Sequence, residues 1–68
     1  MVALLTVLLY LALIFSPGTY TTTTIYTIEH QHQAQVDAVE SDPYLYNQVK
    51  IQYAEAASRI HVTDDIEH

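Results

Sequence analysis

The densest group of side chains able to bind a metal ion or carry a proton is Glu29, His30 and His32. In a β-strand His30 and His32 would share a face, whereas in a helix they diverge by about 200°. A four-coordinate metal site needs further ligands at a fixed spacing, and the remaining His61 and His68 lie far along the chain. We therefore expect a solvated polar cluster without a metal ion; the alternative is that His30 or His32 is an axial ligand of a haem or pigment near the membrane edge.

Side chains suited to catalysis are equally scarce. The chain has no cysteine, so it has no thiol nucleophile and no disulfide. Ser16, Ser41 and Ser58 lack the flanking glycines of a nucleophile elbow, and a single glycine cannot form a phosphate-binding loop. Asp64 and Asp65 are paired carboxylates, but nothing near the end of the chain would desolvate them. The sequence predicts that the protein is not an enzyme and uses no cofactor.

Charged residues are confined to one part of the 68-residue chain. All ten Asp, Glu, Lys and Arg residues lie from Glu29 onward, with a formal net charge of −6. We therefore divide the sequence into an uncharged hydrophobic and Thr-rich segment, residues 1–28, and an acidic tail, residues 29–68. Only Lys50 and Arg59 are basic, which is too few to neutralise phosphates and argues against nucleic acid as a partner.

The most apolar stretch is residues 2–15, in which Thr6 is the only plainly polar side chain. Ten of its fourteen residues are Leu, Ile, Val or Phe, which favour the bilayer by about 3–6 kcal/mol on the insertion scale. As a helix the stretch would be about 21 Å long, against about 30 Å for a hydrocarbon core. The sequence predicts a membrane-embedded N-terminal helix. Its expected anchor residues are Leu4, Leu5, Leu8, Leu9, Leu11, Leu13, Ile14 and Phe15.

Three interpretations of this apolar stretch compete. The favoured one is a single-pass anchor, a helix over residues 2–28 about 40 Å long with a kink at Pro17-Gly18. The second is a cleaved signal peptide, because Ser16-Pro17-Gly18 resembles a small-x-small cleavage site, although no basic residue precedes the apolar run. The third is a buried core helix, which would need more apolar surface than the rest of the chain offers.

The segment that follows, residues 19–28, is rich in Thr with Tyr and Ile between. Such a β-branched and aromatic composition is typical of a β-strand. No second strand of comparable strength is evident in the sequence, and an isolated strand is not stable. We expect the segment to remain helical as a continuation of the anchor, with pairing to another molecule as the alternative.

Good helix formers dominate the acidic tail, and the tail contains no glycine. A break and restart are predicted near Asp42 and Pro43, because Asp caps a helix N-terminus and Pro costs nothing at the first helical position. The second helix of the tail is expected to run from about Pro43 to His61. Glu55 and Arg59 would form an i, i+4 ion pair on it.

One face of this predicted helix is apolar, too narrow to fold alone, and is expected to pack on a partner helix. The residues of this apolar stripe are Tyr46, Val49, Tyr53, Ala56 and Ile60. In a competing interpretation the stripe closes an internal hairpin against a 27–40 helix that carries Ile28, Val36 and Val39.

These patterns predict a mostly α-helical protein: a membrane-embedded N-terminal helix followed by an acidic amphipathic helical tail broken near Pro43. We expect a small single-pass structural or accessory subunit of a membrane complex or of a repeated helical assembly, acting by helix packing. Its partners would be the lipid bilayer and other protein subunits or copies of itself. The alternative is a short secreted acidic peptide released by cleavage after Gly18.

Overall fold

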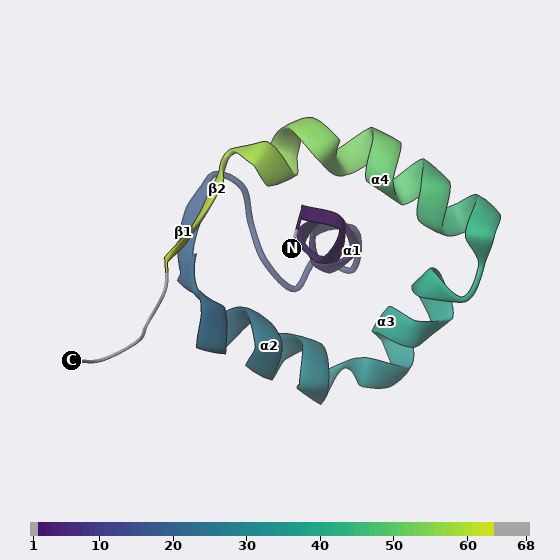
Figure 1. The fold of residues 1–68 in the computed structure, drawn as a ribbon, viewed down its shortest axis with the longest axis horizontal. Helices are drawn as coiled ribbons and strands as arrows, with labels where there is room; N and C mark the ends of the chain where they lie inside the picture. Colours follow the sequence, from purple (N-terminus) through teal and green to yellow (C-terminus); the bar gives the residue numbers. More distant parts are fainter. Residues whose placement is uncertain (1, 64–68) are drawn as a thin grey trace.

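The computed structural model describes residues 2–63, which fold into four helices and a two-stranded sheet (Figure 1). In chain order the elements are α1 (Val2–Tyr10), β1 (Gly18–Thr21), α2 (Thr22–Gln31), α3 (Gln33–Glu40), α4 (Pro43–Ser58) and β2 (Ile60–Thr63). The prediction of a mostly helical chain is confirmed. None of the helices between residues 2 and 63 combines the length and the apolar character needed to cross a bilayer, so the membrane-embedded N-terminal helix is not supported.

The apolar helix α1 lies inside a ring formed by the rest of the chain. In Figure 1 α1 is seen end-on at the centre, with α2, α3 and α4 around it. Its nine residues, about 13.5 Å of helix, run along the shortest dimension of a molecule whose extents are 41 × 24 × 16 Å. The most extensive packing of α1 is against α4. The ring thus takes the place that lipid was expected to occupy.

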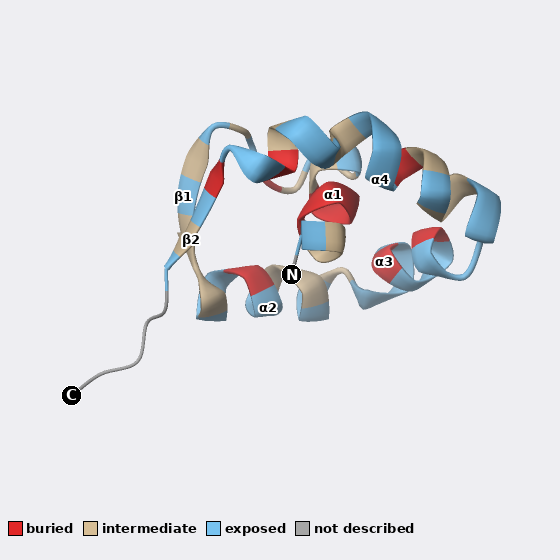
Figure 2. Ribbon diagram, turned by 45° about the horizontal axis from the view of Figure 1, so that its top comes forward, coloured by how far each residue is buried: buried red, intermediate tan, exposed pale blue. Residues whose placement is uncertain are grey.

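The core shows why the enclosed arrangement is possible. Its buried apolar residues are Leu5, Val7, Leu8, Ile14, Ile25, Val36, Val39, Val49, Ala57 and Ile60. Six of these ten come from the ring, and Figure 2 shows buried parts, in red, on α2, α3, α4 and β2. The expectation that the rest of the chain has too little apolar surface to enclose this helix was therefore wrong. The one buried polar side chain among the described residues, Thr6, donates a 2.6 Å hydrogen bond to the Ala3 carbonyl oxygen, so its hydroxyl is satisfied.

α1 ends at Tyr10, five residues before the end of the predicted apolar helix. The N–H of Leu13 donates to the Leu8 carbonyl and the N–H of Ala12 donates to the Leu9 carbonyl, both at 3.0 Å. This pair of bonds is a Schellman motif, in which the residue after the C-cap is left-handed. Ala12 takes that conformation, with φ of 62°. The position usually carries glycine, so the sequence contains no signal that the helix stops here.

The Thr-rich segment divides between a strand and a helix. β1 pairs in parallel with β2, with Gly18 opposite Ile60 and Thr21 opposite Thr63. The expected continuous helix is therefore wrong over Gly18–Thr21, where β2 supplies the second strand that the sequence did not reveal. α2 begins at Thr22 because the Thr21 hydroxyl accepts the Thr24 N–H at 3.1 Å and caps the helix.

The acidic half follows the predicted break. Asp42 is the N-cap of α4, its carboxylate accepting the Leu45 N–H at 3.2 Å, and Pro43 is the first helical residue. The predicted ion pair is also present, with 2.9 Å between the Arg59 guanidinium and the Glu55 carboxylate. α4 ends at Ser58, and not near His61, because Ile60–Thr63 forms β2.

Candidate functional site

The predicted partner interface, Tyr46, Val49, Tyr53, Ala56 and Ile60, is named here the α4 stripe, although Ile60 lies in β2 and not in α4. The stripe faces the inside of the ring. Val49 and Ile60 are buried, and Tyr46, Tyr53 and Ala56 are half-buried. The stripe was expected to pack on a partner helix. Because α4 packs chiefly on α1, the same chain supplies that helix. The competing hairpin is partly correct. The stripe is internal, but it packs mainly on α1 and only to a smaller extent on α3, which carries Val36 and Val39.

Two aromatic contacts mark the edges of this packing. The rings of Tyr10 and Tyr53 meet edge to face, with centroids 6.2 Å apart. The Lys50 ammonium lies 4.5 Å from the centroid of the Tyr46 ring, a cation–π arrangement at the outer side of α4. Each tyrosine keeps part of its surface accessible, so the stripe is accessible at its edges and closed at its centre.

The predicted anchor residues have three different environments. Leu5, Leu8 and Ile14 are buried, and Phe15 is 71 % exposed. The remaining four, which are half-buried at the ends of the core, are Leu4, Leu9, Leu11 and Leu13. Only Phe15 among them projects from the folded chain with most of its surface free.

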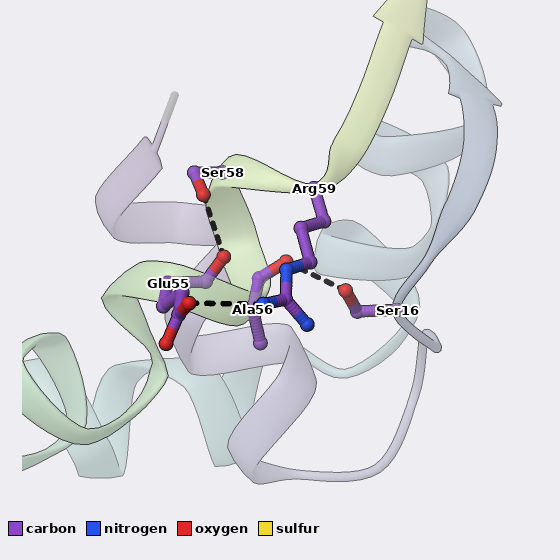
Figure 3. A network of polar contacts seen from close by, with 5 residues as sticks. All are labelled: Ser16, Glu55, Ala56, Ser58 and Arg59. Carbon is purple, nitrogen blue, oxygen red and sulfur yellow. Dashed lines mark hydrogen bonds and ion pairs between the residues drawn. The ribbon is translucent and has the colours of Figure 1, made fainter.

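The segment that carries Phe15 is a feature that pattern analysis did not single out. We name residues 11–17, between α1 and β1, the Phe15 loop. The Phe15 N–H donates to the Tyr20 hydroxyl oxygen at 2.9 Å. The Ser16 hydroxyl donates to the Ala56 carbonyl oxygen of α4 at 2.7 Å (Figure 3). With the Schellman motif at its start, the loop is fixed at three points. Its composition, apolar and free of charge, is the signal by which it could have been found.

The residues of the predicted polar cluster lie at the C-terminal end of α2, where Glu29 and His32 are half-buried. His30 is exposed, and the His32 Nδ1 lies 2.9 Å from the Gln35 Oε1. No three His, Cys, Asp or Glu side chains gather into a metal-binding group anywhere in residues 2–63. The paired carboxylates Asp64 and Asp65 lie outside the described residues.

One carboxyl group on α3 has an altered acidity. Partial burial raises the pKa of Glu40 above its usual value, and the negative charges of Glu29 and Asp37 raise the pKa further. The carboxylates of Glu29 in α2 and Asp37 in α3 are thus close enough to Glu40 to repel its negative charge. This is an acidic surface cluster with no counter-cation identified beside it within residues 2–63.

The described part of the chain contains no pocket. Its features are therefore surfaces: the edges of the α4 stripe, the Phe15 loop and the acidic cluster. Comparison of the chain with protein-family models, with curated proteins and with solved structures finds no match.

Proposed function

We propose that the protein is a small accessory or structural subunit that works at a membrane by packing of its helices against lipid and other protein chains or copies of itself. The observation that carries the proposal is the pairing of α1 with the α4 stripe. The stripe accommodates an apolar helix, and α1 is an apolar helix without a charged side chain. A face built in this way functions by association, and it can accept the same kind of helix from a second chain.

The sequence predicts that the apolar N-terminal helix contacts lipid and that the α4 stripe contacts a partner helix. In the fold these two surfaces cover each other, so both contacts depend on whether α1 stays in the ring. While α1 occupies the ring, the stripe is covered. If α1 enters lipid, Val49, Tyr53 and Ile60 become available to a partner helix. Single-pass anchoring requires the larger change of structure, because a helix over residues 2–28 would have to replace the Schellman motif and β1. Surface binding requires no such change, because the ring stays closed and the folded protein binds the membrane surface.

A secreted acidic peptide is the less favoured function. Cleavage after Gly18 would remove α1 and Ile14, and with them four of the ten buried apolar side chains. The remaining helices would lose the helix around which they pack. The intact mass of the native protein tests this alternative, because a mature chain beginning at Thr19 would contradict the proposed subunit.

Membrane association is tested by flotation of the full chain with phosphatidylcholine vesicles, followed by carbonate extraction. Flotation that resists carbonate is expected for the single-pass form, and flotation that carbonate reverses is expected for surface binding. A chain that stays with the soluble fraction in both steps would contradict the membrane part of the proposal.

Association with protein is tested by light scattering of the purified chain across a range of concentrations in a mild detergent. We expect oligomers that dissociate on dilution, and we expect Tyr53→Ala to weaken them more than Tyr44→Ala does. Tyr44 is a suitable control because it lies on the same helix and is 75 % exposed. A monomer at every concentration, with no partner retained on purification from native membranes, would contradict association as the function.

A further inference from the structure

We propose that the Phe15 loop is a lipid-contact surface, which docks the folded protein on an uncharged bilayer by inserting the Phe15 side chain. This inference rests on the proposed membrane association and names the surface that makes the contact. The partner is the interfacial region of a zwitterionic bilayer, where aromatic and aliphatic side chains are favoured.

The loop presents Phe15 in a fixed position. The Tyr20 hydroxyl oxygen accepts the Phe15 N–H, and Ser16 next to it is bonded to the Ala56 carbonyl on α4. Ile14, on the other side, is buried in the core. Because Ile14 and Ser16 are held in place, the Phe15 side chain stays outside the core of the protein. Ordering before docking lowers the entropic cost of the contact.

The charge distribution favours an uncharged, apolar partner. No residue of the Phe15 loop is charged, nor is any residue before Glu29. The nearest charged group along the hydrogen-bonded path is Arg59, whose N–H donates to the same Ala56 carbonyl that accepts the Ser16 hydroxyl (Figure 3). Its guanidinium is paired with the Glu55 carboxylate, so the pair adds no net charge beside the loop. The acidic chain as a whole would be repelled by anionic lipid.

The size of the surface favours lipid over a second copy of the chain. A stable dimer buries about 800 Å² on each partner, which is nearly a fifth of the 4453 Å² surface of this protein. The loop exposes Phe15, Ala12 and Pro17, with Leu11 and Leu13 half-buried, and this is a much smaller area. Insertion of one aromatic side chain into an interface needs no such area.

The experiment uses tryptophan fluorescence, because the natural chain contains no Trp. Phe15→Trp in the full-length protein places a single reporter in the loop, and Tyr44→Trp places the matched reporter at an exposed position of α4. On addition of phosphatidylcholine vesicles we expect a blue shift and quenching by bromine-labelled lipid for the loop reporter alone. Phe15→Ser should weaken vesicle binding about tenfold or more, measured by flotation, with an unchanged circular dichroism spectrum.

The possible outcomes separate this inference from the proposed function. Vesicle binding by the wild type that survives Phe15→Ser, with no shift of the loop reporter, would overturn the inference and leave membrane association intact. Binding that resists carbonate would also overturn it, because lipid would then contact α1 and not the loop of a closed ring. Absence of vesicle binding by the wild type would overturn both. A blue shift that depends on protein concentration without vesicles would assign the loop to self-association and overturn the lipid contact.

Discussion

The ring of Tyr10, the last residue of α1, meets the ring of Tyr53 in α4 at an interplanar angle of 76°. An edge-to-face pair of this kind directs the positive edge of one ring at the negative face of the other. The pair joins the uncharged segment to the acidic tail. The two halves that composition separates are therefore one folded unit, held together where α1 crosses α4.

Tyr53→Ala is expected to lower the free energy of unfolding by about 2 kcal/mol, because it removes both the aromatic pair and part of the cover over α1. Tyr44→Ala, on the same helix but mostly exposed, should change it by less than about 0.5 kcal/mol. Urea unfolding followed by circular dichroism measures both. Equal effects of the two substitutions would mean that α4 does not pack on α1 through Tyr53.

Leu8 and Phe15 belong to the same apolar run but differ in environment. Leu8→Ala should destabilise the protein by about 2–5 kcal/mol, since Leu8 is fully buried and its loss leaves a cavity. Phe15→Ala should have little effect on unfolding, because the side chain is mostly exposed. Similar losses for both, measured by urea unfolding, would contradict the closed ring.

Ala12→Gly is expected to stabilise the fold by about 1 kcal/mol. At φ of 62° the methyl group of alanine is strained, whereas glycine adopts this conformation at no steric cost. Ala54→Gly, at an exposed position inside α4, is the matched control and should destabilise by about 0.5–1 kcal/mol. If both substitutions lower the thermal midpoint, α1 does not end in the Schellman motif.

The acidic cluster predicts a pH dependence to which Glu40 contributes. Because the pKa of Glu40 is raised in the fold, the folded state binds its proton more tightly than the unfolded state. The contribution of Glu40 therefore becomes more favourable as the pH falls through its folded pKa, and it is complete below the ordinary value of 4.5. Glu40→Gln should raise the thermal midpoint at pH 7 and reduce the stabilisation gained on mild acidification.

Salt and a control substitution check this assignment. Repulsion among exposed carboxylates is screened, so the gain from Glu40→Gln should shrink at high salt. Glu55→Gln removes an attractive exposed pair and should leave the thermal midpoint nearly unchanged. A midpoint at pH 7 that is lower for Glu40→Gln than for the wild type would contradict a repulsive cluster.

Local signals in the sequence determined where α4 begins and which ion pair it carries. Asp42 and Pro43 begin α4 because capping and the proline ring act on their own backbone, whatever lies around them. The ion pair of Glu55 and Arg59 depends only on helical spacing. The confinement of charge to residues after position 28 is likewise a property of the sequence alone.

Tertiary structure decided the environment of α1, the pairing of β1 with β2, and the exposure of Phe15. A helix that is apolar on all sides satisfies its backbone equally well in lipid or in protein, so its pattern does not distinguish the two. The sequence predicts that the helix continues to about His61. Ile60–Thr63 forms a strand instead because the chain returns beside Gly18–Thr21. These outcomes depend on contacts between residues far apart in the chain, and such contacts leave no periodic signal in the sequence of either partner.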